Sequence, residues 1–404
     1  MKHSFLLFLL IITSSLYSQS NIKLKKGVWN ANLKITNQDN LPFILSISKK
    51  DNVLTYSIIN GQETILLDPE IISGDSTIVK FPYFNSELVF KKVNKRKLIG
   101  VWKNYNKGEN YNIPFFANYN NLNQKYTSIN SVSGKWAATF EPNTNNSYPA
   151  VGIFKQCPNS PYVTGTFLTE TGDYRYLSGH LNKDSLYLSC FDGSHAFYFK
   201  AAINADSISG EFFSGKHWGC KWEAFKNDNA TLKSPEKITY IKPKATLNFE
   251  LPDLDSIPYF FPNDDTKEKV VIIQIMGTWC PNCLDETMYY KSLYEKYNSK
   301  GLEIIAVCYE TGNSFNQHTT NINRLKNKLN INYKLLVGGA ASKDLASIHF
   351  NMLNEVISFP TSIFIDKSGN VRRVHTGFNG PGTGTYYNEY IEKTNSLIEE
   401  LLAE

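Results

Sequence analysis

The chain has 404 residues, 14% of them aromatic, and a formal net charge of +5. This length allows two or three domains with a large apolar core. The weak charge argues against nucleic acid or a membrane surface as the binding partner.

Residues 1–20 have the pattern of a secretion signal peptide. Lys2 supplies a positive start, residues 5–12 form an apolar core too short to span a bilayer, and small residues allow cleavage after Ser18. The alternative is an uncleaved membrane anchor. No cysteine lies near the cleavage point, so lipid attachment is not expected there. The segment predicts an exported protein of the periplasm or cell envelope, where disulfides persist.

Residues 21–226 have the pattern of antiparallel β-structure. Short runs alternate apolar and polar residues and are separated by Asn, Gly, Asp and Pro, as in 186–189 and 196–200. No stretch in this region has a convincing helical period. We therefore predict a β-rich domain over 21–226.

This β region is typical of a duplicated unit. Its halves, about 21–105 and 134–226, align at an offset of about 107 to 110 residues, as expected of repeats with few insertions. Residues 106–133 would connect them. Two repeated meanders can protect their edges as one large barrel or two small packed barrels, and we favour one continuous β-domain. The aligned segments are 27–29 with 134–136, 74–76 with 183–185, 87–91 with 196–200, and 98–100 with 208–210.

Polar and aromatic residues gather in the loops of the second repeat, whereas the first repeat has no histidine. Segment 172–176 and the side chains of Asp192, His195, His217 and Trp218 are candidates for a binding site at a barrel mouth. They can equally be turn residues, because Asp-Gly favours turns. No local ligand pair accompanies the histidines, so no metal is expected.

Three cysteines, Cys157, Cys190 and Cys220, also fall in the second repeat, so at least one is unpaired. Cys190 and Cys220 lie in strand-like runs, and a cross-strand disulfide between them stays open. The alternative, which we slightly favour, is that some are small buried hydrophobic residues.

Residues 227–244 contain Lys, Asn, Asp and two prolines with few apolar side chains, which predicts an interdomain linker. Residues 245–404 then predict an α/β domain. The expected elements are a strand or hairpin beginning at 249–251, a strand at 270–276, a helix after residue 280, strands at 302–307 and 333–337, helices at 313–329 and 342–350, a hairpin of 361–365 and 371–376, and a closing helix at 386–402.

The segment 279–283, Trp-Cys-Pro-Asn-Cys, lies between the apolar run 270–276 and a helical pattern. Its first cysteine would sit at a helix N-terminus, where free N–H groups and the dipole favour a thiolate, and Pro281 suits the first helical position. Cys280 is thus predicted to be the attacking thiol and Cys283 the resolving thiol of a dithiol centre. Half a zinc site or a structural bridge are the alternatives, but zinc would want a second ligand pair at similar spacing.

Three segments resemble the thioredoxin fold, and most closely the extracytoplasmic TlpA/ResA-like thiol-disulfide oxidoreductases. They are 277–283, 359–366 and 367–371, and the resemblance covers residues 245–404. It implies an exported oxidoreductase that needs no cofactor and acts on disulfide-containing substrate proteins. A membrane-bound dithiol donor would recycle it, since its compartment is oxidising. The resemblance suggests reduction, for example in cytochrome c maturation, although the sequence leaves the direction open.

The resemblance also implies a substrate groove beside the cysteines. Pro360 would be a cis-proline facing the pair, and Thr361 would help to dock the substrate backbone. Trp279 would shield the site. Phe359 is bulkier than the residue usual before this proline, so it is expected to alter the groove.

Two polar positions bear on the second thiol, Cys283. Glu286 matches an acidic residue that these reductases often carry in this helix, and it would tune or relay the proton of Cys283. Gln274 stands where thioredoxin has a buried aspartate, which places more of that role on Glu286 or on water. Cys308 ends a predicted strand at the edge that faces the site; it is a third redox thiol or, as we favour, a buried core cysteine.

Two other functions stay open. The β-domain could be the functional part and bind a glycan, lipid or partner protein, with the thioredoxin-like domain in a docking or accessory role. An intact Cys-Pro-Asn-Cys motif weighs against this. A thiol peroxidase is ranked lower, because that chemistry wants a lone peroxidatic cysteine; peroxide consumption surviving in a Cys280→Ser variant would rule out Cys280 in that role.

Overall fold

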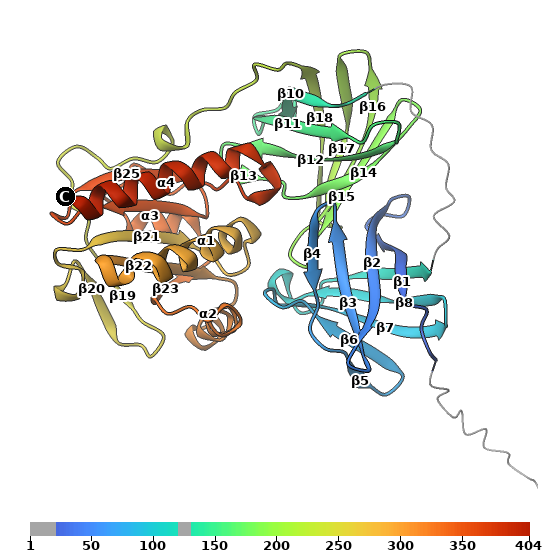
Figure 1. Ribbon diagram of the computed structural model, residues 1–404, viewed down its shortest axis with the longest axis horizontal. Coiled ribbons are helices and arrows are strands. Elements are labelled where there is room, and N and C mark those ends of the chain that lie inside the picture. The colour runs from blue at the N-terminus through green and yellow to red at the C-terminus, as the bar shows by residue number, and fades with distance from the viewer. Residues whose placement is uncertain (1–21, 120–130) are drawn as a thin grey trace, which may run out of the picture.

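The computed structural model describes residues 22–119 and 131–404, which form two antiparallel β-units and one α/β unit (Figure 1). The predicted signal peptide lies outside these residues. Within the described part, no helix combines the length and the apolar character needed to cross a membrane.

The first β-unit is an open antiparallel sheet of nine strands in the order β4-β3-β2-β1-β9-β8-β7-β6-β5, and we call it the half-barrel. Alternate side chains of its long strands are buried, as the period-two sequence pattern requires. The strands are β1 (Gly27–Lys34), β2 (Asn40–Lys50), β3 (Val53–Asn60), β4 (Glu63–Leu66), β5 (Ile71–Ser73), β6 (Ser76–Lys80), β7 (Ser86–Asn94), β8 (Lys97–Asn104) and β9 (Asn112–Tyr119).

The second β-unit has the strand order β11-β10-β18-β17-β16-β15-β14-β12-β13, and an extra pairing of β11 with β12 closes it into a barrel. Closure removes the free edges that an open sheet would leave. The strands are β10 (Gly134–Phe140), β11 (Tyr148–Gln156), β12 (Tyr162–Thr169), β13 (Gly172–Asp173), β14 (Leu177–Asn182), β15 (Ser185–Phe191), β16 (Ala196–Asn204), β17 (Ser207–Ser214) and β18 (Trp218–Lys226).

Matching local details support the duplication. The indole N–H of Trp29 donates to the carbonyl of Lys25 (3.0 Å), and that of Trp136 donates to the carbonyl of Val132 (2.9 Å), each four residues upstream. The strand that contains each tryptophan, β1 or β10, pairs with the last strand of its own repeat. The predicted order of a duplicated barrel-like meander followed by an α/β fold is confirmed.

Two details of the β prediction are wrong. The repeats form one closed barrel and one open sheet, rather than one large barrel or two small ones. Residues 112–119, expected in the connection 106–133, form β9 and pair with β1. The alternating burial of Ile113, Phe115 and Ala117 gives this segment strand character, which its many Asn and Tyr residues obscured in the sequence.

The half-barrel remains open because a hairpin of the barrel, β15–β16, fills it. Phe191 at the tip of β15 is fully buried, with its ring centroid 4.6 Å from that of Phe43, 5.4 Å from that of Phe81 and 5.1 Å from that of Trp102. The amide of Asn60 donates to the carbonyl of Phe191 (3.0 Å). Aromatic contacts of this kind stabilise beyond simple area burial, so the hairpin tip is held firmly inside the half-barrel.

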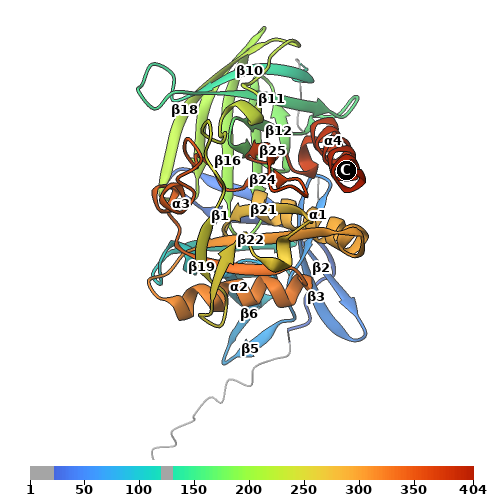
Figure 2. The ribbon, with the colours of Figure 1, turned by 90° about the vertical axis from the view of Figure 1, so that its left-hand side faces the viewer.

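The α/β unit has a five-stranded sheet in the order β23-β22-β21-β24-β25, and its hairpin β19–β20 forms a separate two-stranded sheet that lies against β23. Helices α1 and α4 pack together on one face, and α2 lies on the other (Figure 2). Every residue of β21 is buried, as its unbroken apolar run requires. The elements are β19 (Phe249–Pro252), β20 (Pro258–Phe261), β21 (Val270–Met276), α1 (Pro281–Tyr297), β22 (Leu302–Glu310), α2 (Phe315–Leu329), β23 (Lys334–Ala340), α3 (Lys343–His349), β24 (Thr361–Ile365), β25 (Val371–Thr376) and α4 (Thr385–Ala403).

Candidate functional site

The two cysteines of the motif lie where β21 ends and α1 begins. Cys280 is the N-cap of α1, and the backbone N–H of Cys283 donates to its Sγ (3.4 Å). Pro281 occupies the first turn, where its missing N–H needs no partner. A sulfur that accepts a helix N-terminal N–H is well placed to carry negative charge.

The two thiols differ in access. Cys280 is 9% exposed, whereas Cys283 is fully buried beneath it. Burial raises the pKa of the Cys283 thiol well above its ordinary value, and the adjacent Cys280 sulfur raises it further. The thiolate is the reactive form. Cys280 is therefore the sulfur that solvent can reach, and Cys283 is shielded from it.

The turn before β24 supplies the opposite side of the site. The Phe359–Pro360 peptide bond is cis, and the Phe359 carbonyl oxygen lies 3.6 Å from Cys280 Sγ. The ring of Phe359 stacks on Tyr309, with centroids 5.4 Å apart. The Thr361 side chain is buried and donates to the carbonyl of Ser358 (2.8 Å), so it holds this turn.

Glu286 is fully buried behind the cysteine pair. Its carboxylate accepts hydrogen bonds from Gln274 Nε2 (2.9 Å), Ser362 Oγ (3.1 Å), Tyr290 OH (3.1 Å) and Tyr390 OH (3.1 Å). Burial raises its pKa to about 7, although these four donors oppose the rise. Its negative charge in turn raises the pKa of the Cys283 thiol.

Replacing Glu286 by glutamine is expected to change how stability depends on pH. An acid whose pKa is higher in the folded than in the unfolded protein stabilises the fold fully at a pH below its unfolded-state pKa. That stabilisation is lost as the pH rises through the folded-state pKa. Wild type should therefore lose about 3 kcal/mol relative to Glu286→Gln as pH rises from 4 to 8, since the pKa moves from 4.5 to about 7. Urea unfolding of both proteins across this range measures the difference, and parallel pH dependences would contradict it.

The barrel contributes most of the cavity into which Cys280 opens. This cavity, of about 440 Å³, is lined on the α/β side by Cys280, Asn282 and Phe359. Trp279 is half-buried beside it; its indole donates to the Tyr309 carbonyl (2.9 Å), and its own carbonyl accepts from Ser194 Oγ of the barrel (2.8 Å). The barrel residues lining the cavity are Tyr148, Pro149, Thr169, Glu170, Thr171, Gly172, Asp173, Tyr174, His195 and Phe197.

The four residues proposed for a β-domain site divide between two places. His195 lines the cavity at Cys280, and its Nδ1 lies 3.4 Å from the buried carboxylate of Asp192. His217 and Trp218 line a separate surface cavity of about 460 Å³, where His217 bonds to Tyr111 OH (3.1 Å). The ring of Phe212 contacts both Phe197 of the first cavity and Trp218 of the second, so the two cavities are neighbours and a single site at a barrel mouth stays a prediction.

Arg175, in the candidate segment 172–176, is a buried residue that contacts all three units. Its guanidinium contacts Asp192 of the barrel (3.3 Å), Glu63 of the half-barrel (2.5 Å) and Asp285 of α1. It also donates to the carbonyl of Pro281 (3.2 Å). One side chain thus ties all three units together beside the cysteine pair; the sequence placed it in the candidate binding segment 172–176 but gave it no role of its own.

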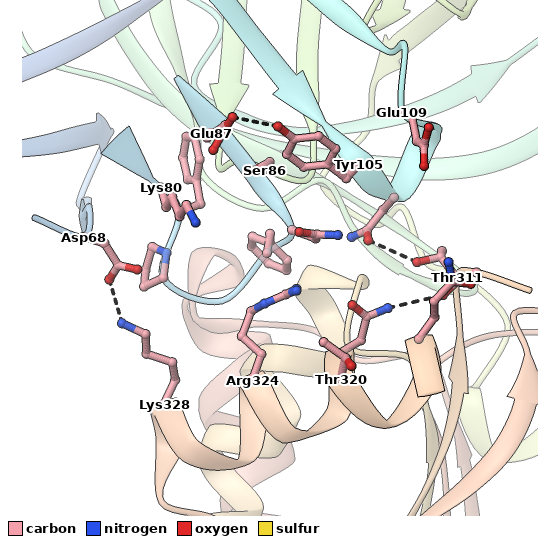
Figure 3. A pocket seen from close by; sticks show the side chains of 18 of the residues that line it. Asp68, Lys80, Ser86, Glu87, Tyr105, Glu109, Thr311, Thr320, Arg324 and Lys328 are labelled. Carbon is pink, nitrogen blue, oxygen red and sulfur yellow. Dashed lines mark hydrogen bonds and ion pairs between the residues drawn. The ribbon is translucent and has the colours of Figure 1, made fainter. Parts of the chain in front are cut away.

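A larger cavity, of about 760 Å³, separates the half-barrel from α2 (Figure 3). It is crossed by an ion pair of Lys328 with Asp68 (2.6 Å) and edged by a hydrogen bond from Thr311 to Asn106 (3.0 Å). Its walls contain no cysteine. Polar contacts therefore join the half-barrel and the α/β unit around this cavity, although buried apolar residues of the two units also form one continuous cluster. The barrel lines the other cavity, into which Cys280 opens.

The other four cysteines lie outside the Cys280–Cys283 pair, and no disulfide joins any of the six in this structure. Cys190 and Cys220 lie on β15 and β18, which two strands separate, so no cross-strand disulfide joins them. Cys308 is buried in β22 beside Met276, and burial raises its pKa well above the ordinary value. Cys157 is exposed.

Comparison with known proteins places the α/β unit among redox proteins. The Redoxin family matches residues 242–390. Thiol-disulfide oxidoreductase ResA of Bacillus thuringiensis subsp. konkukian is 29% identical over 152 residues, 37% of this chain and 76% of that protein. ResA of Halalkalibacterium halodurans is 28% identical over 134 residues, 33% of this chain and 68% of that protein. The solved structure of a thioredoxin-family thiol:disulfide interchange protein from Chlorobium tepidum TLS has 20% identity and a TM-score of 0.30, covering 40% of this chain and 99% of its own.

Proposed function

Over its C-terminal part this chain is a ResA/TlpA-like thiol-disulfide oxidoreductase of the thioredoxin superfamily, and we propose that it reduces disulfides of exported substrate proteins through Cys280 and Cys283. One observation carries the proposal. An outer sulfur accepts the N–H of Cys283 at the start of α1, and a buried second thiol lies directly behind it. This arrangement suits an attacking thiolate followed by an internal resolving step.

The proposed reaction transfers two electrons in two exchanges. Cys280 thiolate attacks one sulfur of the substrate disulfide, and the other substrate sulfur leaves as a thiolate that takes up a proton. Cys283 then loses its proton and attacks Cys280 Sγ, which releases the second substrate thiol and leaves the Cys280–Cys283 disulfide. An external dithiol donor, membrane-bound in our proposal, reduces that disulfide again.

Glu286 is proposed to assist the second exchange. Its pKa of about 7 lets it exchange protons at neutral pH, and it is electrostatically coupled to the Cys283 thiol. Pro360 and Phe359 are proposed to hold the substrate backbone beside Cys280, and Trp279 to shelter the mixed disulfide. We further propose export to the periplasm or cell envelope; apocytochrome thiols are one candidate substrate class.

The reduction potential of the cysteine pair tests the proposed direction. We expect a value around −270 mV or lower, as for a reductase supplied by a dithiol donor. The measurement is equilibration with dithiothreitol or glutathione and thiol trapping. A value near −120 mV would reverse the direction to disulfide formation, and the lack of a two-electron couple would contradict the function itself. The protein for this measurement carries alanine at Cys157, Cys190, Cys220 and Cys308.

A further inference from the structure

The barrel wall of the cavity at Cys280 is fixed to the α/β unit by hydrogen bonds between side chains and backbone groups and by close packing. Ser358 Oγ donates to the carbonyl of Thr171 (2.9 Å), and the N–H of Gly380 donates to the carboxylate of Asp173 (2.6 Å). Gly377 lies so close that a Cβ there would be 2.6 Å from the Thr171 carbonyl carbon. The turn between β12 and β13 with its flanking residues, which we call the barrel rim (residues 169–173), therefore forms a fixed wall of the site.

This wall limits the shape of what can reach the thiol. Cys280 is only 9% exposed and opens into about 440 Å³, a volume typical of a small-ligand site. A disulfide can approach Cys280 only on a chain thin enough to enter between the barrel rim and Phe359. An extended peptide meets that condition, whereas a disulfide packed in a folded surface would bring its neighbouring strands against the barrel.

The lining also has a defined chemistry. Its apolar part is aromatic, with Tyr148, Tyr174 and Phe197 from the barrel facing Phe359. Glu170 lines the cavity, and among the described residues no hydrogen bond or ion pair engages its carboxylate. No lysine or arginine lines the cavity. Such a wall favours an apolar or cationic group and disfavours a carboxylate-bearing one.

We propose that the barrel rim is the second wall of the substrate site and selects a disulfide in an extended peptide, with an apolar or aromatic residue and a lysine or arginine beside the cysteine. The inference rests on the proposed function and adds the substrate class to it. Glu170 is then a specificity-determining residue that contacts the substrate cation. The exchange chemistry is the two-electron reaction given above, with the reduced enzyme as electron donor.

Single-turnover reduction by the full-length dithiol protein tests this assignment without a recycling partner. The probes are a fluorogenic disulfide peptide with Phe and Lys beside the cysteine, the same peptide with Glu in place of Lys, oxidised glutathione, and native ribonuclease A. We expect wild type to react about tenfold faster with the Lys peptide than with the Glu peptide, and slowest with the native protein.

Charge reversal at the barrel rim supplies the decisive variant. Glu170→Lys should remove or invert the preference between the two peptides, while Glu250→Lys, which reverses an exposed charge on β19 outside the cavity, should keep it. Glu170→Gln, which only neutralises the carboxylate, should reduce the preference for the Lys peptide over the Glu peptide. This variant replaces Glu170→Lys in the test if Glu170→Lys does not fold.

Three results would overturn the inference while leaving the oxidoreductase intact. They are equal rates for both peptides in wild type, native ribonuclease A reacting as fast as the peptides, and oxidised glutathione reacting fastest, which would assign the cavity to low-molecular-weight disulfides. A wild-type protein that exchanges with none of these probes, nor with oxidised dithiothreitol, would instead overturn the proposed function. Such a result would mean that the cysteine pair itself is unreactive, whatever the barrel rim selects.

Discussion

Replacing Cys280 by serine is expected to lower disulfide reduction by on the order of 10³-fold or more, the scale of losing a covalent nucleophile. A serine hydroxyl is protonated at neutral pH and does not exchange with disulfide sulfur, and Cys283 is fully buried and cannot take over the attack. Single-turnover reduction of a disulfide peptide, followed by thiol trapping, measures the loss.

The partner variants distinguish the two sulfur atoms. Cys283→Ser should keep the first exchange and accumulate a mixed disulfide between Cys280 and the substrate, detectable as a covalent mass increase. Cys308→Ala is the matched control, because it removes another buried thiol of the same α/β unit and should leave the rate within about twofold of wild type. Reduction that persists in Cys280→Ser, or that disappears in Cys308→Ala alone, would show that the reactive thiol has been misassigned.

The second large effect is expected at Arg175. Arg175→Met should destabilise the protein by about 3–5 kcal/mol, because removing one partner of a buried ion pair leaves uncompensated charge inside the protein. Three carboxylates depend on this guanidinium, and the side chains of Glu63, Asp192 and Asp285 are 15%, 0% and 11% exposed. Urea unfolding at neutral pH measures the loss.

The effect of Arg175→Met should also increase with pH. Burial raises the pKa of Asp285 to about 7, and Arg175 is the main group opposing that rise. Without Arg175 the pKa rises further, and an acid with a raised folded pKa costs stability as pH increases. The loss of stability is therefore expected to be larger at pH 8 than at pH 5.

Arg372 provides the comparison for this variant. It pairs with Glu404 (2.7 Å) and Glu400 (3.1 Å) on the surface, where water screens the charges. Arg372→Met should cost much less stability than Arg175→Met, because exposed ion pairs contribute little. A second comparison adds Glu63→Gln and Asp285→Asn to Arg175→Met and should recover part of the loss, because fewer buried charges remain unpaired. Equal losses in Arg175→Met and Arg372→Met would mean that the buried cluster does not join the units energetically.

The redox centre was predictable because its determinants are local in the chain. The run 270–276 specifies a buried strand, and Pro281, directly after Cys280, is the first residue of helix α1. These neighbours place one sulfur at a helix N-terminus and the other one turn inside, whatever the rest of the chain does. The repeat was predictable for a related reason, since an alignment at constant offset needs no knowledge of contacts.

The environment of Glu286 shows where local pattern became insufficient. Its position three residues after Cys283 follows from the sequence, but its donors come from β21, β24 and α4 as well as from α1. Tyr390 lies 104 residues away along the chain. The rise of the Glu286 pKa to about 7 thus depends on tertiary packing, because the elements that cover a carboxyl group decide how deeply it is buried.

The sequence by itself determined the dithiol motif, the α/β elements around it and the duplicated β-pattern, because spacing and periodicity act over a few residues. Only the tertiary structure decided that one repeat closes into a barrel while the other wraps around Phe191. It likewise decided that Arg175 meets Glu63 and Asp285, which are 112 and 110 residues away, and that Glu170 shares a cavity with Cys280. These contacts depend on how the surfaces of the half-barrel, the barrel and the α/β unit fit together. No sequence pattern within one segment encodes the shape of another segment.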